Sequence, residues 1–130
     1  MTASDVQLVR GAWDAFSRGD LAAAAAVLAP GVRWHGADDP DNEGGCRSRD
    51  EAVAFIERSL ADGITATLLD IHDAGDRLVA VIQARTPREW EQPPDLHGEV
   101  ITVRDGKVTD MVVYATVEEA LGAVGLAASS

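Results

Sequence analysis

The chain has 130 residues, of which 46% are hydrophobic and 25% are charged. This composition excludes intrinsic disorder and fits one globular domain over residues 1–130. A formal net charge of −11 gives an anionic surface, which disfavours nucleic acid and anionic membranes as partners. No apolar run approaches the roughly 20 residues of a membrane span, and the first residues lack a signal-peptide pattern, so we expect a cytoplasmic protein.

The N-terminal third of the sequence predicts two helices. A capping box at Ser4 is expected to open the first, because a hydroxyl there satisfies an unpaired backbone N–H. Apolar residues then recur at three- and four-residue steps, which places Trp13 and Phe16 on one buried stripe. Asp20 is expected to cap a second, alanine-rich helix over residues 21–29.

A short strand, a long loop and a third helix are expected next. The strand covers residues 32–35 and carries Trp34, and the acidic loop after it covers residues 36–47. Loops of this length in a compact domain are more often functional than idle. A second capping box, at Ser48, opens a helix whose apolar stripe includes Phe55.

From residue 64 onward the pattern changes to β-rich runs and one last helix. Asp105-Gly106 separates the final two runs and predicts a tight hairpin, because its type I′ turn needs positive φ at both positions. A loop over residues 87–95 holds Trp90 between prolines, and Thr116 opens the terminal helix. This order predicts an α+β, cone-shaped fold with helices packed on one face of a curved, mostly antiparallel sheet. The four runs cover residues 64–72, 78–86, 96–104 and 107–115.

The last hairpin carries the candidate chemistry. With a two-residue turn, Glu99 faces Val112 and His97 faces Tyr114. His97 and Glu99 lie two apart on one strand and so share a face, where either side chain is suited to general acid or base work. An ordinary polar pair on the solvent or dimer face is the alternative. Tyr114 is expected either to donate a hydrogen bond to a ligand oxygen or to pack at an interface.

A second register of this hairpin stays open. Bulges are common in curved sheets, and one within residues 107–115 would change which side chains point inward. Without a bulge, Asp110 and Val112 face the pocket. With one, Met111 and Val113 do so instead.

Metal and cofactor chemistry have no recognisable motif in this sequence. The three histidines, His35, His72 and His97, lack the spacing of a metal site. The single cysteine, Cys46, excludes an internal disulfide and a cysteine-rich metal site, and we expect a passive thiol. We therefore predict no metal and no cofactor.

Several short sequence segments resemble those of a known protein family, and the resemblance covers residues 5–121. The sequence resembles the nuclear transport factor 2-like superfamily, in particular its SnoaL-like branch. That resemblance implies a cone whose mouth accepts a small apolar molecule, and a homodimer formed through sheet faces. The segments are the aromatic-bearing first helix running into Ser17-Arg18-Gly19-Asp20-Leu21, then Leu28-Ala29-Pro30-Gly31-Val32-Arg33-Trp34, Arg49-Asp50-Glu51-Ala52, and Asp105-Gly106-Lys107-Val108 with Tyr114 behind it.

The sequence departs from the catalytic branches of that superfamily. Ketosteroid isomerase-like members carry a carboxylate base on the short strand, where this chain has Trp34, and their oxyanion-hole acid falls at Gly98 or Glu99. The aspartate of SnoaL-like cyclases falls at Thr116, which the capping box already explains. Epoxide hydrolase members use an Arg-x-Asp piece, whereas the nearest phrase here is Arg85-Thr86-Pro87. These departures weigh against all three activities.

Two functions of different classes remain. The first is a pocket protein that binds an apolar, polyketide- or steroid-like ligand, with no reaction assigned. The second is an isomerase, cyclase or dehydratase in which His97 and Glu99 transfer a proton. The side chains expected to contact the ligand are those of Trp13, Phe16, Trp34, Phe55, Trp90, Met111 and Tyr114.

Overall fold

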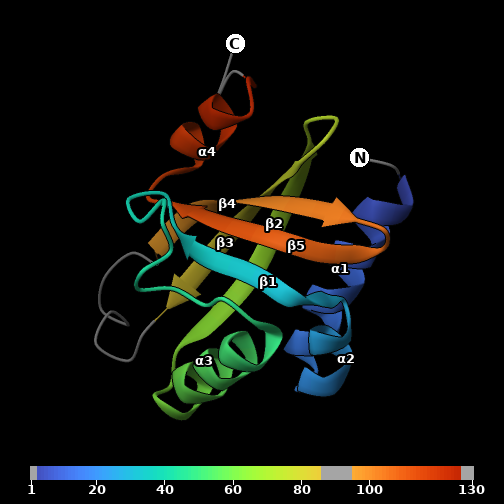
Figure 1. Ribbon diagram of the computed structural model, residues 1–130, viewed down its shortest axis with the longest axis vertical. Coiled ribbons are helices and arrows are strands. Elements are labelled where there is room, and N and C mark those ends of the chain that lie inside the picture. Colours follow the sequence, from blue (N-terminus) through green and yellow to red (C-terminus); the bar gives the residue numbers. More distant parts are fainter. Residues whose placement is uncertain (1–2, 86–94, 127–130) are drawn as a thin grey trace.

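The computed structural model describes residues 3–85 and 95–126, which form four helices and a five-stranded sheet (Figure 1). This arrangement confirms the predicted α+β fold with a curved, mostly antiparallel sheet. Within the described residues, no helix combines the length and the apolar character needed to cross a membrane. In chain order the elements are α1 (Ala3–Ser17), α2 (Leu21–Ala26), β1 (Leu28–Gly36), α3 (Arg49–Ala61), β2 (Thr65–Asp73), β3 (Leu78–Arg85), β4 (Asp95–Arg104), β5 (Lys107–Tyr114) and α4 (Val117–Ala123).

The predicted caps open three of the four helices. Each cap side chain accepts a backbone N–H three residues further on, which satisfies one of the unpaired donors at a helix start. The expected start of α1 is wrong by two residues, because a cap at Ser4 would make Asp5 the first helical residue, whereas the helix begins at Ala3. The three capping bonds, each 3.1 Å long, join Asp20 to the N–H of Ala23, Ser48 to that of Glu51, and Thr116 to that of Glu119.

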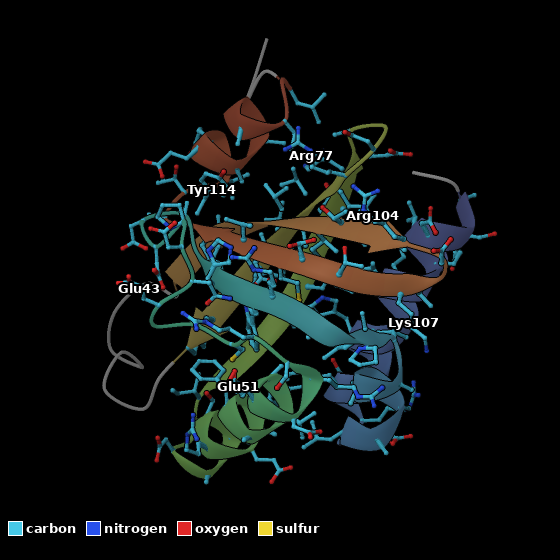
Figure 2. The ribbon with its side chains drawn as sticks, viewed as in Figure 1. Glu43, Glu51, Arg77, Arg104, Lys107 and Tyr114 are labelled. Carbon is cyan, nitrogen blue, oxygen red and sulfur yellow. The ribbon has the colours of Figure 1, made fainter. Side chains whose placement is uncertain are left out.

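The second helix is shorter than expected, because the chain leaves it to join the sheet. It ends at Ala26, and β1 begins almost directly afterwards. Lys107 lies beside this end of α2 (Figure 2), and its Nζ donates a 2.6 Å hydrogen bond to the carbonyl oxygen of Ala26. The N–H of Val108 donates to the carbonyl oxygen of Val27 at 2.8 Å. Contacts from β5 therefore end the helix and start the strand.

The sheet order is β1-β5-β4-β3-β2, so neighbours in space are not always neighbours in sequence. β1 runs parallel to β5, and all other pairs are antiparallel. The predicted tight hairpin is confirmed, because Asp105 and Gly106 both have positive φ (52° and 74°) and Arg104 pairs with Lys107.

A bulge at Thr109 settles the register of this hairpin. Val103 still pairs with Val108, but Thr102 pairs with Asp110, which leaves Thr109 as the extra residue. The hydroxyl of Thr109 donates to the Asp110 carboxylate at 2.9 Å. The register without a bulge is therefore wrong: Glu99 faces Val113 rather than Val112, and Tyr114 faces Gly98 rather than His97. The bulged alternative is correct.

Different helices cover the two faces of the sheet. Helices α1, α2 and α3 lie on one side, and α4 lies on the other (Figure 1). α4 packs tightly over β4, because a Cβ built on Gly98 would lie 2.6 Å from the Cβ of Ala120. The apolar cluster under α4 contains Val79, Val100, Ala120 and Leu121. The larger core, and the site described below, lie on the side of α1 to α3.

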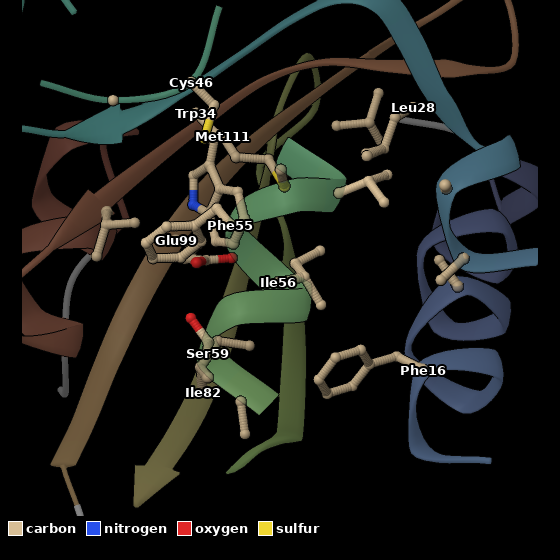
Figure 3. Close-up of a pocket in the computed structure, with 18 of the residues that line it drawn as sticks. Phe16, Leu28, Trp34, Cys46, Phe55, Ile56, Ser59, Ile82, Glu99 and Met111 are labelled. Carbon is tan, nitrogen blue, oxygen red and sulfur yellow. The ribbon is translucent and has the colours of Figure 1, made fainter. Parts of the chain in front are cut away.

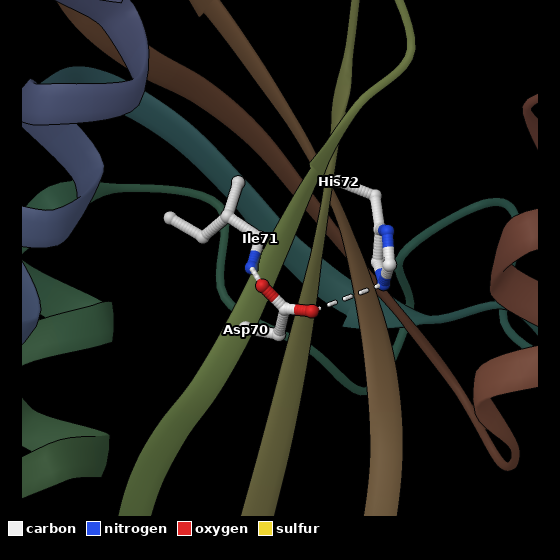
Figure 4. Close-up of polar contacts among 3 residues, drawn as sticks. All are labelled: Asp70, Ile71 and His72. Carbon is white, nitrogen blue, oxygen red and sulfur yellow. Dashed lines mark hydrogen bonds and ion pairs between the residues drawn. The ribbon is translucent and has the colours of Figure 1, made fainter.

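His72 belongs to the α4 side of the sheet. Its pairing partner, Val79, contributes to the cluster under α4. The His72 Nε2 lies 3.7 Å from Oδ2 of Asp70, whose other oxygen accepts the N–H of Ile71 at 2.8 Å (Figure 4). The His72 side chain is 40% exposed, so this pair is a surface feature at the β2 bulge rather than part of the pocket.

Candidate functional site

A cavity of about 690 Å³ lies between the sheet and helices α1, α2 and α3. Its walls are mainly apolar: Val9 from α1, Ile56 from α3, Ile82 from β3 and Val113 from β5 all contribute. Figure 3 shows Trp34, Phe55 and Glu99 gathered on one side of this space and Phe16 and Leu28 on the other. The bulge at Thr109 is what turns Val113 toward the cavity.

Most of the residues predicted for the site line this single cavity. They come from five elements that are spread along the sequence, and the fold brings them together. Trp90 lies outside the described residues. Tyr114 is the exception among those described. The predicted residues that line the cavity are Trp13, Phe16, Trp34, Phe55, His97, Glu99 and Met111.

Tyr114 lies on the opposite face of the sheet, which corrects its predicted place in the pocket. It packs against the cluster formed by Val79, Val100, Ala120 and Leu121, and Figure 2 shows it next to α4. The cause is the extra residue at Thr109, because it shifts the later side chains of β5 by one position.

Glu99 is the most unusual side chain in the cavity. It is 4% exposed, and the loss of hydration raises its pKa from the usual 4.5 to about 7. A hydrogen bond with the Trp34 side chain acts in the opposite direction and lowers this pKa. Since the indole N–H can only donate, Glu99 is the acceptor. Near neutral pH the carboxyl group therefore exists in both protonation states.

His97 lies beside Glu99 on the same face of β4, as predicted from their spacing. Its Nε2 is 4.0 Å from Oε1 of Glu99, and the two side chains are 13% and 6% exposed. This distance is longer than a direct hydrogen bond but leaves both groups within reach of one ligand atom. The arrangement places two titratable groups in one largely apolar cavity.

Aromatic side chains form two edge-to-face pairs around the cavity. Trp34 and Phe55 have ring centroids 5.1 Å apart at 83°. Trp13 and Phe16 on α1 are 5.7 Å apart at 76°. Both geometries match the preferred edge-to-face arrangement of aromatic rings. The first pair ties β1 to α3 directly beside Glu99.

The fold adds wall residues that the sequence did not single out. Cys46 lines the cavity, and burial raises the pKa of its thiol, so it stays protonated as an ordinary buried thiol does. Ser59 and Arg58 of α3 bring polar groups to the same wall. No sequence signal marks these three as wall residues. Arg58 and Ser59 reach the cavity through the placement of α3, and Cys46 reaches it through its backbone pairing with Trp34. Within residues 3–85 and 95–126, no three His, Cys, Asp or Glu side chains gather as a metal site would require.

The sequence model of the SnoaL-like domain matches residues 9–111. The chain belongs to the SnoaL-like family. The matched range ends at Met111, so it includes the pocket-lining parts of α1, β1, α3 and β4. Among curated proteins, no relative matches this SnoaL-like domain.

Solved structures share the fold of this SnoaL-like domain at low sequence identity. A protein of unknown function with a nuclear transport factor 2-like fold, from Burkholderia pseudomallei, is 21% identical with a TM-score of 0.69, over 95% of this chain and 99% of that one. A candidate polyketide cyclase from Xanthomonas campestris is 24% identical, with a TM-score of 0.66, over 94% and 97%. A candidate ketosteroid isomerase from Kribbella flavida is 17% identical, with a TM-score of 0.70, over 87% and 78%.

Proposed function

We propose that this SnoaL-like domain binds an apolar small molecule that presents a carbonyl or hydroxyl oxygen to Glu99. The observation that carries the proposal is a buried carboxyl group with a pKa of about 7 in the wall of a mainly apolar cavity. In its neutral form such a group donates a hydrogen bond to a ligand oxygen from within the apolar wall.

The size and the walls of the cavity suit a ligand with fused rings. A volume of about 690 Å³ lies within the range of roughly 300–1,000 Å³ found for small-molecule sites. Trp34 and Phe55 offer ring edges and faces next to Glu99. The names of two structural neighbours, a candidate polyketide cyclase and a candidate ketosteroid isomerase, support a polyketide- or steroid-like ligand.

Binding of α-tetralone, a neutral bicyclic aromatic ketone, tests this proposal. We expect saturable binding by calorimetry, and we expect Trp34→Ala to weaken it about tenfold or more, as truncation of an aromatic anchor does. Thr116→Ala is the matched control, because it removes one polar contact on the α4 side of the sheet. Saturable binding that is the same in Trp34→Ala and in the unmodified protein would place the site elsewhere.

A second function, proton-transfer catalysis, is favoured by one further observation. His97 lies 4.0 Å from Glu99, so a base and an acid face the same bound molecule. Trp34 stands where ketosteroid isomerase-like members carry their base, which leaves His97 to accept the proton here. An isomerase, cyclase or dehydratase reaction on an enolisable ketone uses such a pair. The expected effect of its removal is set out in the Discussion.

We also propose that the domain forms a homodimer through the face of the sheet next to α4. Leu96 on this face is 48% exposed, which leaves a large apolar side chain in solvent in the single chain. Sedimentation should give twice the chain mass of 13.7 kDa. Leu96→Glu should shift the protein toward monomer, because it places like charges across a two-fold contact. A monomer of the unmodified protein at micromolar concentration would overturn this proposal.

A further inference from the structure

Trp34 lies on an edge strand, which pairs with β5 on one side, so the outer side of its backbone needs partners from beyond the five strands. β1 is the end strand of the sheet order. The N–H of Trp34 donates to the carbonyl oxygen of Cys46 at 2.9 Å, and its own carbonyl oxygen accepts the N–H of Cys46 at 2.7 Å. The loop after β1 therefore folds back and supplies both backbone partners of the residue that binds Glu99.

Asn42 fixes Cys46 in this loop. It is fully buried, and its Nδ2 donates a 2.7 Å hydrogen bond to the carbonyl oxygen of Cys46. The carbonyl oxygen of Asn42 accepts Nε of Arg47, also at 2.7 Å. Asn42 has a φ of +54°, a conformation that asparagine tolerates better than most residues. One residue thus ties the loop to Cys46 through its side chain and to Arg47 through its backbone.

Two features show that this position is built for the amide. The Asn42 Oδ1 is buried without a hydrogen-bond partner, which costs stability that an apolar side chain would not. Gly45 has no room for a side chain, since a Cβ there would collide with Oδ1 of Asn42 and with the Trp34 carbonyl oxygen. The Nδ2 contact is therefore what the asparagine provides.

We propose that Asn42 is a positioning residue, which holds Cys46 against Trp34 so that the indole N–H stays directed at Glu99. This inference rests on the proposed function in one respect: Glu99 is taken as the group that meets the ligand. Hydrogen bonds link Asn42 to Cys46, Cys46 to the backbone of Trp34, and the indole of Trp34 to Glu99.

Asn42→Gly tests the proposal, because glycine accepts the positive φ of this position and removes the side chain that carries the amide. We expect the indole N–H of Trp34, identified in ¹⁵N spectra by its loss in Trp34→Phe, to shift and to exchange faster with solvent. The Glu99 titration, fitted together with that of its neighbour His97, should move to higher pH, because the hydrogen bond that favours the charged form is weakened. Thr116→Ala, the control on the other face, should leave both signals unchanged.

Two outcomes would overturn the proposal. One is a folded Asn42→Gly protein with the indole signal and the Glu99 titration of the unmodified protein. If that variant does not fold, Arg47→Ala replaces it, since this change removes the hydrogen bond from Nε to the carbonyl oxygen of Asn42 and leaves the Asn42 side chain in place. In Arg47→Ala we expect smaller shifts of the indole N–H signal and of the Glu99 titration. The absence of both shifts is the second outcome that would overturn the proposal. Failure of α-tetralone to bind would reject the proposed function, whereas these two signals are read without any ligand.

Discussion

Glu99→Gln is expected to stabilise the protein at about pH 8 and to leave its stability at about pH 4 nearly unchanged. The folded protein holds a proton on Glu99 between pH 4.5 and about 7, whereas the unfolded chain releases it. The contribution of Glu99 to the free energy of unfolding therefore falls as the pH rises through that range and does not change further above it. The stability lost between pH 4.5 and about 7 corresponds to about 3 kcal/mol. Glutamine does not ionise, so the Glu99→Gln protein does not lose it.

Denaturant unfolding of the two proteins across this pH range measures the effect. Glutamine keeps an oxygen that accepts the Trp34 indole N–H, so the comparison isolates the charge. Glu57→Gln on the exposed side of α3 makes the same chemical change in water and serves as the control. A free energy of unfolding that falls equally with pH in Glu99→Gln and in the unmodified protein would show that Glu99 is hydrated in the folded state.

The second large effect concerns exchange of the protons next to the carbonyl group of bound α-tetralone. If the His97–Glu99 pair transfers protons, Glu99→Gln should lower the rate of deuterium exchange by roughly 10²–10⁴-fold. Affinity should change much less, since the acid acts on the enolate that forms during the reaction. His97→Gln should give a loss of similar size, and the double variant should lose little more than either single variant, because the two groups act as one unit.

Proton NMR in deuterated buffer measures this exchange without knowledge of the natural substrate. Leu78→Ala is the matched control, because Leu78 is buried in the same core but does not line the cavity. A rate in the unmodified protein equal to that in buffer, despite saturable binding, would leave ligand binding as the function and remove the catalytic one.

Local sequence signals predicted where elements begin but not how the site is assembled. Ser48, Thr116 and Asp105-Gly106 act through residues three positions away or fewer, so their effect is visible in a short stretch of sequence. The contact of Trp34 with Glu99 is different. It depends on β5 lying between β1 and β4, a strand order that no local pattern specifies.

Asn42 shows a second limit of sequence reasoning. The length of its loop predicts a functional segment, but no pattern in the sequence distinguishes Asn42 from the acidic and glycine residues around it. The value of that amide comes from complete burial against Cys46 and Gly45, which only the folded loop creates. The spacing of His97 and Glu99, in contrast, was sufficient to place both on one face of a strand, because alternate residues share a face. That this face lines the cavity is seen only in the structure.

The bulge at Thr109 also governs how this domain can be compared with its relatives. The extra residue between the turn and the cavity shifts by one position which residues of β5 point inward after it. A letter-by-letter alignment to a relative without that residue would assign Asp110 or Val112 to the ligand, although Met111 and Val113 line the cavity. The equivalent positions on this strand must therefore be taken from superposed structures, even where the two sequences align well.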